Sequence, residues 1–433
     1  MADSRRSFVR ISYDGKDITE ALTASLIEFS YSDKASKESD EITLKCHDRE
    51  NNWIGDWYPK KTVQKVEKTV EQKSDYSAMA QTLQLKAEFS DILLDEKPKP
   101  IKITDNAVSG TILRAVICVE NWEYEGDKRE LDCGSFEIDS VDFNGPPDTV
   151  TIKALSIPIS SSLRRSKKTR AWEETTLQKI AQDISDDAKL ELMYEVESDI
   201  QLDRVEQEEN ADMAFLLELC QQYGVALKVT DNKVILFEEE AYEAKPVIDT
   251  FDKKEYGNGG RILGYSFSQD TGETVCKVIS SYKDPKSGRL VQATFEPPEP
   301  PATGQIAYVN MRPGDLRGDD FRNGEDTSSE SSGGTHNTGF NKFNDITVDF
   351  QNPRPDRTDN AQRQAKAVAR ERNKNEWTCT LRLRGNLNMV SSVNINITGF
   401  GVYNGKYSVF DVQHNLGNKY ETVIKARKVL KGY

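Results

Sequence analysis

The chain has 433 residues, enough for two to four domains, and 36% of them are hydrophobic and 30% charged. Its 72 acidic residues outnumber its 58 basic ones, and the net charge of −14 disfavours a protein that grips DNA or an anionic membrane. No apolar run is long enough for a transmembrane helix, and the N-terminus lacks the apolar core of a signal peptide. We therefore expect a soluble chain made in a cytoplasm.

The first part of the chain, residues 1–158, is predicted to be an antiparallel β-barrel domain. Strand patterns occupy Phe8–Ser12, Leu26–Tyr31 and Glu41–His47, and they resume at Ile112–Val119. Between them, residues 61–108 have weak helical spacing and form a predicted insertion. This insertion is either a solvated helical excursion or a docking surface for a partner.

A hairpin from Leu131 to Ser156 closes this first domain and carries three carboxylates, Glu137, Asp139 and Asp142. Residues i and i+2 of a strand lie roughly 7 Å apart, within the spacing of paired glycosidase carboxylates. A solvated strand face explains the same alternation without any chemistry, and we favour that interpretation. The apolar parity flips between Ile138 and Val141, which predicts a β-bulge there.

Residues 159–244 are predicted to form a small α/β module. Thr175–Gln178 resembles a capping box before a helix, and a second helix is expected to begin at Asn210 and end at Gly224. A hairpin of Val225–Val229 and Lys233–Phe237 follows. The apolar stripes of the helices are expected to be core rather than a cofactor pocket.

Residues 245–433 are predicted to be a second β-barrel domain with one helix and a flexible insert. The insert at 313–343 is rich in Gly, Ser, Asp and Asn, and the helix spans Asn360–Arg372. No sequence repeat is visible between the two β-domains. The expected strands are Arg261–Ser268, Thr274–Tyr282, Leu290–Phe295, Trp377–Arg384, Val393–Ile397, Lys406–Val412 and Tyr420–Ala426.

Few residues of the chain suit catalysis or metal binding. His336 lies in the flexible insert, His414 is expected at a strand end, and His47 follows Cys46 on a strand, where neighbours point to opposite faces. Gly399–Gly405 lacks the spacing of a dinucleotide loop and predicts a tight hairpin instead. The six scattered cysteines predict buried free thiols, namely Cys46, Cys118, Cys133, Cys220, Cys276 and Cys379.

The fold class is therefore mainly β with some α+β, with two antiparallel β-barrels flanking an α/β module. We expect no catalytic residues, no cofactor and no metal site, which favours a structural or interaction protein. Two alternatives stay open. One is a cell-wall hydrolase that uses Glu137 and Asp139, and the other is a carbohydrate-binding adhesin that uses Trp53 and Trp57.

Several stretches, taken in order, resemble the phage late-control protein D family, the tail-hub proteins related to the hub portion of VgrG. The resemblance covers nearly the whole chain. Its motifs are Val9–Ile11 with Gly15–Thr19, Ser32–Asp33 with Ser39–Leu44, the hairpin Gly134–Ala154, Thr176–Ala181, Asn210–Leu216, Tyr223–Val225, Gly399–Gly401, Gly405–Tyr407 and Val412–His414.

This resemblance implies a homotrimer in which each subunit contributes two barrels to a ring. Such a ring is a symmetry adaptor between a sixfold tail tube and a threefold central spike. The implied partners are the tail tube protein, the spike protein, the tape-measure protein and other baseplate components. The implied location is the tail of a phage or a phage-tail-like particle, assembled in the bacterial host cytoplasm. The acidic balance suits a lumen that must not retain DNA.

Overall fold

The computed structural model describes residues 4–13, 15–49, 112–156, 163, 166–257, 259–283, 290–301, 304–310, 346–348 and 358–433. These residues are mainly β, as predicted. The insertion at 61–108, the polar insert at 313–343, His336, Trp53 and Trp57 lie outside the described residues. The expectations for them therefore stay predictions.

The N-terminal half of the structure is built from seven strands and one short helix. Six of the strands lie close to predicted positions, whereas the two-residue strand β2 and the helix α1 were not predicted. The strand Leu26–Lys34 extends three residues beyond the predicted end at Tyr31. The elements are β1 Arg6–Tyr13, β2 Lys16–Asp17, α1 Thr19–Thr23, β3 Leu26–Lys34, β4 Glu41–His47, β5 Ile112–Glu120, β6 Lys128–Asn144 and β7 Thr149–Leu155.

The C-terminal half contributes six further strands to the same sheet. They are β13 Val247–Asp252, β14 Ile262–Gln269, β19 Trp377–Arg384, β20 Asn394–Thr398, β21 Gly405–Leu416 and β22 Tyr420–Lys428. The glycines between β20 and β21 form a hairpin connection with the 3₁₀ turn Gly401–Tyr403, which confirms the prediction for Gly399–Gly405.

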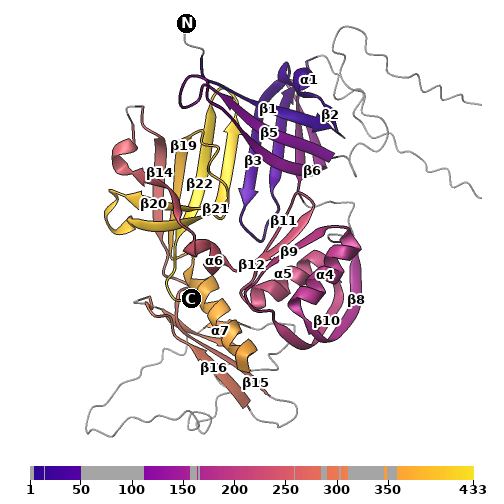
Figure 1. The fold of residues 1–433 in the computed structure, drawn as a ribbon, viewed down its shortest axis with the longest axis vertical. Coiled ribbons are helices and arrows are strands. Elements are labelled where there is room, and N and C mark those ends of the chain that lie inside the picture. The colour runs from indigo at the N-terminus through magenta and orange to yellow at the C-terminus, as the bar shows by residue number, and fades with distance from the viewer. Residues whose placement is uncertain are drawn as a thin grey trace, which may run out of the picture.

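The two halves share one 13-stranded sheet, because β21 pairs antiparallel with β3. Figure 1 shows the two groups of strands standing side by side at the top of the molecule. The main path through the described strands is open and runs from β14 to β2 in the order β14-β19-β22-β21-β3-β4-β7-β6-β5-β1-β2. The two closed barrels predicted from the sequence are therefore not confirmed.

The two halves repeat the same strand order. Along the sheet, β3-β4-β7-β6-β5 of the first half corresponds to β14-β19-β22-β21-β20 of the second. The register agrees as well: Phe29 opposite Leu44 corresponds to Tyr265 opposite Leu381. Even the irregularities recur, since the bulge after Ile138 in β6 corresponds to the bulge after Val409 in β21. The chain is therefore an internal duplication at the level of these five strands.

The duplication is also visible in the sequence once the strands are aligned. LIEFSYSDK of Leu26–Lys34 corresponds to ILGYSFSQD of 262–270, and Ile152-Lys153-Ala154 corresponds to Ile424-Lys425-Ala426. The repeat was not visible from the sequence alone. The repeat was hidden because its matching strands are short and are separated by insertions at different places.

The middle module packs two helices against two small sheets. Strands β8 and β10 form one sheet, and β11, β12 and β9 form the other. Figure 1 shows this module below the N-terminal half, with α4 and α5 side by side. Its elements are β8 Lys167–Thr176, α4 Leu177–Ala188, β9 Glu191–Glu195, β10 Gln201–Ala211, α5 Asp212–Gln222, β11 Ala226–Thr230, β12 Lys233–Phe237 and α6 Glu239–Ala244.

The helix ends of this module differ in detail from the prediction. Thr176 caps α4 by accepting a hydrogen bond from the backbone N–H of Lys179, so the cap lies one residue later than expected and has no reciprocal Gln178 contact. Asn210 does not cap α5, because it belongs to β10 and the N-cap position is Ala211. Gly224 ends α5 at a φ of +72°, the left-handed conformation that favours glycine, as predicted.

The chain between β14 and β19 forms a separate four-stranded sheet. The strands Val275–Lys283 (β15) and Leu290–Phe295 (β16), predicted as part of the second barrel, pair here with Gln305–Val309 (β17) and Ile346–Val348 (β18). Helix α7, Thr358–Asn373, packs on this sheet through Ala365, Val368 and Ala369. The small side chains on this face of the helix leave room for it to lie close to the strands.

Candidate assembly interface

The carboxylates of the β6–β7 hairpin do not form a pair suited to acid–base chemistry. Glu137 is 5% exposed, whereas Asp139 and Asp142 are exposed. The register shifts between Ile138 and Ser140, which confirms the predicted bulge. The solvated-face interpretation is thus wrong for Glu137 and correct for the other two.

The thiol and imidazole groups of the candidate Cys46–His47 pair are also kept apart. Cys46 belongs to the N-terminal core, and burial raises the pKa of its thiol to about 11. His47, the next residue on β4, is half-buried and outside that core. All six cysteines are free thiols, and all except the half-buried Cys276 are buried, as predicted. A neutral, buried thiol is a poor nucleophile.

No group of three or more His, Cys, Asp or Glu side chains is placed to hold a metal ion in the part of the chain that the structure describes. Nor is any helix of these residues long and apolar enough to cross a membrane. A surface pocket of about 430 Å³ lies beside α7, with Asp270, Glu273 and Arg372 in its lining. Arg372 forms an ion pair with Glu273, and the Asp270 carboxylate accepts the backbone N–H of Gly272, so these side chains already bind groups of the protein.

Among the described residues, many side-chain contacts gather at the junction where β21 and β3 join the two halves of the large sheet. His414 of β21 is completely buried there, and its ring stacks on Tyr31 of β3 at 6.0 Å and 9°. Its Nδ1 lies 2.8 Å from the Tyr420 hydroxyl, and its Nε2 lies 3.0 Å from the Met389 carbonyl. Neutral imidazole satisfies both contacts by accepting from Tyr420 and donating to Met389.

Burial lowers the pKa of His414 to about 4, so the ring is neutral at physiological pH. The sequence placed this histidine at a strand end, whereas it lies inside β21 and faces the core. Its role is structural, because both ring nitrogens are occupied by protein groups. Trp122 packs beside this group: its indole ring lies 5.4 Å from the Tyr420 ring, and the indole N–H donates to the Gly385 carbonyl.

Ion pairs reinforce the junction on both sides of this aromatic group. Asp411 of β21 accepts from Lys34 of β3 at 3.0 Å and from Lys425 of β22 at 2.9 Å. Asp33 accepts at 2.5 Å from Lys228, which comes from β11 of the middle module. The Asp33 carboxylate also receives the backbone N–H and the hydroxyl of Ser391. Three parts of the chain therefore meet at Asp33.

Lys228 is nearly enclosed and serves two carboxylates. Its ammonium lies 3.3 Å from Asp40, whose side chain is 1% exposed. Burial alone lowers the pKa of Lys228, but Asp33 and Asp40 outweigh it and raise the pKa above the usual value. Burial raises the pKa of Asp40 to about 6, opposed by the nearby Lys228 charge. The lysine is therefore charged and fixes the middle module to the N-terminal half.

A second buried ionic cluster fixes α6 to α7 and β22. Glu239 accepts from Arg427 at 2.9 Å, and Glu243 accepts from Arg370 at 2.7 Å. Lys374 lies 3.4 Å from Glu239. Burial alone would raise the pKa of Glu239, but the surrounding cations Arg427, Lys374 and Arg370 lower it well below its usual range. The acidic start of α6 is thus held against the C-terminal half.

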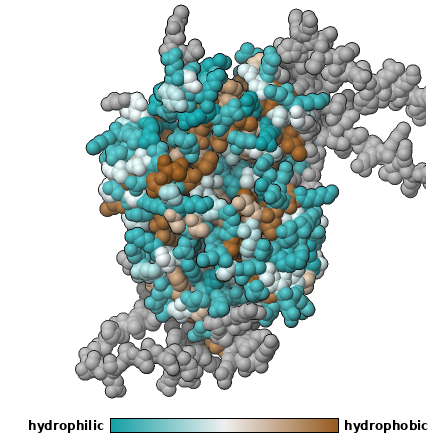
Figure 2. Space-filling view, viewed as in Figure 1, coloured by the Kyte–Doolittle hydropathy of each residue, from teal (hydrophilic) through white to brown (hydrophobic). Residues whose placement is uncertain are grey.

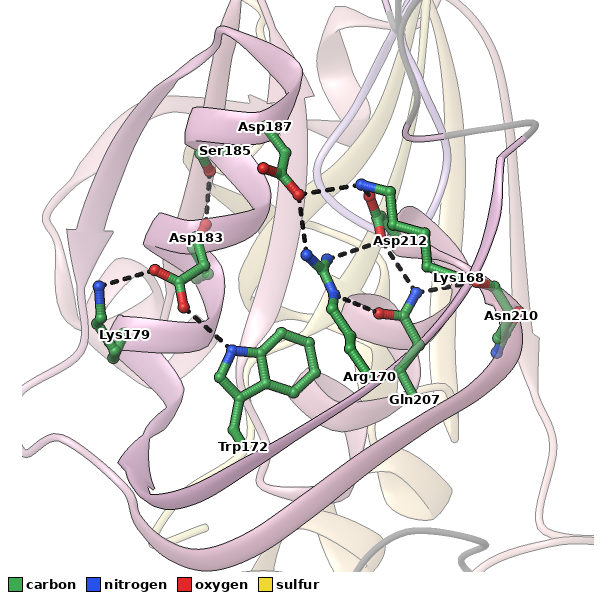
Figure 3. Close-up of polar contacts among 11 residues, drawn as sticks. Lys168, Arg170, Trp172, Lys179, Asp183, Ser185, Asp187, Gln207, Asn210 and Asp212 are labelled. Atoms are coloured by element: carbon green, nitrogen blue, oxygen red, sulfur yellow. Dashed lines mark hydrogen bonds and ion pairs between the residues drawn. The ribbon is translucent and has the colours of Figure 1, made fainter.

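The middle module has its own ionic cluster, drawn in Figure 3. Asp212, the first residue of α5, is completely buried and accepts from Lys168 at 2.7 Å and from Arg170 at 2.8 Å. Gln207 donates to Asp212 and accepts from Arg170. Every polar group of this cluster has a protein partner within it, so it braces β8, β10 and α5 rather than offering a ligand site.

The outer end of the C-terminal half exposes apolar side chains. Tyr265 of the end strand β14 is 40% exposed, Leu263 is 37% exposed, and Tyr256 beside them is 53% exposed. Tyr265 and Phe267 lie edge-on or tilted against Phe400, at 4.9 and 4.8 Å. Figure 2 shows hydrophobic residues gathered over the C-terminal half of the large sheet on the face turned to the viewer. Such a surface is typical of an interaction site.

Sequence reasoning missed the residues of the junction. Lys228 lies far in sequence from Asp33 and Asp40, and no local pattern connects it to them. The β3–β14 resemblance, by contrast, was available in the sequence as aromatic-Ser-aromatic-Ser at Phe29–Ser32 and Tyr265–Ser268.

Two curated phage proteins match part of this sequence, and both are described as probable baseplate hub proteins. The protein of Escherichia phage P2 is 30% identical over 103 residues, and that of Escherichia phage 186 is 26% identical over 106 residues. The match covers 24% of this chain in each case and spans about a quarter of each relative, 26% and 27%. No family model matches the sequence.

The overall fold is shared with a tail protein from Neisseria meningitidis MC58. That crystal structure superposes with a TM-score of 0.57 at 10% identity, over 98% of this chain and 96% of the other. At this identity the likeness establishes the fold alone. Together with the two phage relatives, it confirms the resemblance to the baseplate hub family that the sequence motifs indicated.

Proposed function

We propose that this chain is the structural hub of a contractile phage tail or phage-tail-like particle. In this role three copies form a ring that joins the hexameric tail tube to the trimeric spike. The observation that carries the proposal is the internal duplication, in which β3-β4-β7-β6-β5 and β14-β19-β22-β21-β20 share one strand order and one register. Three chains with two like halves present six like units.

The mechanism is a match of symmetry and needs no chemical step. A hexameric tube requires six similar docking surfaces, and a trimeric spike requires three. A chain with two similar halves meets the first requirement, and its unique middle module and insertions meet the second. In this proposal residues 1–158 and 245–433 are the two tube-like β-barrel domains, and residues 159–244 form the module between them.

The buried ionic clusters support this role because a hub must keep its two halves at a fixed angle. Lys228 joins the middle module to the first half through Asp33, and Glu239 joins α6 to the second half through Arg427. Removing one partner of such a buried pair costs roughly 3–5 kcal/mol, so the arrangement resists rearrangement. The relative placement of the halves is therefore built into the monomer.

The proposal places the protein in the tail baseplate of the assembled particle, with the tube, spike and tape-measure proteins as its partners. It assigns no catalytic role, in keeping with relatives that are described as hub proteins. The net charge of −14 suits a channel wall that repels DNA on its way through.

Native mass spectrometry of the purified chain tests the proposal. We expect a species of three times the 48.9 kDa chain, and we expect it to co-purify with the tail tube protein of the same particle. A chain that stays monomeric at all concentrations and never joins a tube contradicts the proposal. A zymogram on bacterial cell walls tests the hydrolase alternative, and we expect no clearing.

A further inference from the structure

We propose that the edge of β14 pairs antiparallel with the last residues of β6 in a second copy of this chain. The pairing would place Ser266 opposite Asn144 and Phe267 opposite Phe143. This inference deepens the proposed function by naming the contact that joins one subunit to the next. The closure of these contacts into a ring rests on the proposed function. It follows from the internal duplication and from the junction that the chain already makes with itself.

The junction inside the chain is the template for this contact. At that junction the last residues of β21 pair with β3, so that His414 lies opposite Tyr31 and Asn415 lies opposite Ser30. The duplication makes β6 the counterpart of β21 and β14 the counterpart of β3. Inside one chain only one of the two possible junctions is made. The other requires β6 and β14, and these stand far apart along the sheet of a single chain.

Both strands have an open edge among the described residues. β14 is an end of the main path of the large sheet, and β19 is the strand that pairs along it. β5 pairs with β6 as far as Glu137, and on the stretch from Ser140 to Asn144 the described pairing is to β7 alone. Open edges of this kind are ready templates for pairing with another chain.

The register of the proposed pairing is fixed by the residue-by-residue correspondence between the two halves of the chain. Shared pairings make Val141 the counterpart of Val412 and Phe143 the counterpart of His414. In the same way, Phe267 is the counterpart of Tyr31. Transferring the β21–β3 register then gives four directly opposed pairs, Asn144 with Ser266, Phe143 with Phe267, Asp142 with Ser268 and Val141 with Gln269.

The side chains on the two edges fit this register. Phe143 and Phe267 are both half-buried in the single chain, and the pairing would bring them together where Tyr31 and His414 stack at the internal junction. Cross-strand aromatic pairs of this kind stabilise a sheet. No two like charges are opposed. A shift by two residues in one direction would instead set Asp142 against Asp270, and a shift by one would exchange the faces of the strand.

The difference in burial between the two counterpart strands indicates what is missing from the monomer. On β3, Phe29 is fully buried and Tyr31 is 5% exposed, because β21 and residues beyond it cover them. On β14, the counterpart Tyr265 is 40% exposed. β14 has the aromatic pattern of β3, and it pairs with β19 as β3 pairs with β4. What β14 lacks is the neighbour on its other edge that β3 has in β21. Among the described residues, the second half of β6 is an open edge of the matching form, because it is the counterpart of the end of β21 that pairs with β3.

The contact is heterologous, since β14 of one copy meets β6 of the next. Repeated contacts of this type close into a ring when the rotation per copy divides the circle. If the second junction repeats the angle of the first, the halves follow one another at equal steps. Three copies then place six halves around the axis. The exposed carboxylate of Asp142 takes a place at the subunit boundary rather than in a catalytic pair.

Disulfide trapping with permuted cysteines tests the register directly. All four positions, Asp142, Asn144, Ser266 and Ser268, are exposed, so their substitution spares the core. In a Cys276→Ser background, the pairs N144C with S266C and D142C with S268C should cross-link copies under mild oxidation. The same substitutions exchanged, N144C with S268C and D142C with S266C, are the controls. They place the two cysteines at diagonal positions about 7–8 Å apart, beyond the Cα separation that a disulfide usually spans.

Non-reducing gels and native mass spectrometry of the unoxidised variants are read together. Cross-linked dimers and trimers from both matched pairs, and little from the exchanged pairs, support the inference. A three-chain assembly by mass in which the matched pairs do not cross-link better than the exchanged pairs overturns the β14–β6 register and leaves the proposed hub intact. Efficient matched cross-links in open polymers support the pairing and contradict the ring. Monomers without cross-links overturn both.

Discussion

Tyr31 and His414 lie directly opposite each other on β3 and β21, with ring planes 9° apart and centroids separated by 6.0 Å. This pair is the centre of the contact that turns two groups of strands into one sheet. His414 is completely buried and hydrogen-bonded at both nitrogens, and Tyr31 is 5% exposed. The angle between the two halves, on which the proposed ring depends, is therefore set by a closely packed core contact.

Replacing His414 by Phe, the residue at its counterpart position 143, should destabilise the chain. The substitution keeps an aromatic ring but leaves the Tyr420 hydroxyl and the Met389 carbonyl without their partner. Each buried unsatisfied group costs roughly 1–3 kcal/mol, so for the two groups we expect a loss of about 2–6 kcal/mol at pH 7. Urea unfolding measures it. An unchanged midpoint would contradict the structural role of this histidine.

The same residue should make stability depend on pH. The folded pKa of His414 is about 4 against 6.5 in the unfolded chain, so the unfolded chain binds more protons between these values. The contribution of His414 to the free energy of unfolding is present above pH 6.5 and is lost as the pH falls toward 4, by an amount of order 3 kcal/mol. Asp40 acts in the opposite sense, because its pKa is raised to about 6. The free energies of unfolding of wild type and H414F, compared at pH 7 and at pH 5, isolate the effect of the histidine. We expect the gap between the two proteins to be smaller at pH 5, and an equal gap at both pH values would refute the lowered pKa of His414.

Replacing Lys228 by Met should unfold or loosen the attachment of the middle module. The change leaves the buried carboxylates of Asp33 and Asp40 without their cation, at a cost of roughly 3–5 kcal/mol. The matched control is Lys233→Met on the neighbouring strand, since Lys233 pairs with Glu191 at the surface. Exposed pairs contribute at most about 1 kcal/mol. Equal unfolding midpoints for the two variants would show that Lys228 has no special role.

Adding a methyl group at Gly385 should disturb the junction. A Cβ there would lie 2.1 Å from the Tyr420 ring, which is itself hydrogen-bonded to His414. Overpacking of a core commonly costs about 1–3 kcal/mol. Gly264→Ala is the control, because a Cβ at that position meets only the Arg382 side chain at an ordinary distance of 3.8 Å. Thermal unfolding compares the two, and we expect a lower Tm for Gly385→Ala alone.

The sequence predicts most strands of this fold because their apolar and polar residues alternate clearly. Val150, Ile152 and Ala154 alternate in β7, and all three are buried. Alternation carries no information about partners, so the separate sheet of β15–β18 was missed. The same holds for the β21–β3 pairing, which joins strands more than 370 residues apart.

The candidate site was predicted only in part, for physical reasons. The bulge in β6 shifts apolar parity and can be seen locally, whereas the burial of Glu137 depends on what packs over it. The ion pair of Asp33 and Lys228 joins residues from two sheets, and no spacing rule connects them. The repeat of Phe29–Ser32 and Tyr265–Ser268 is short enough to be overlooked until the strand registers are compared.

A reconstruction by cryo-electron microscopy, without imposed symmetry, of the chain bound to its tail tube tests the central claim most directly. The account predicts three copies around a channel, with the strands β3-β4-β7-β6 and β14-β19-β22-β21 alternating at one radius in steps of a sixth of a turn. A map in which the two halves lie at different radii, or in which a number of copies other than three surrounds the axis, would contradict it.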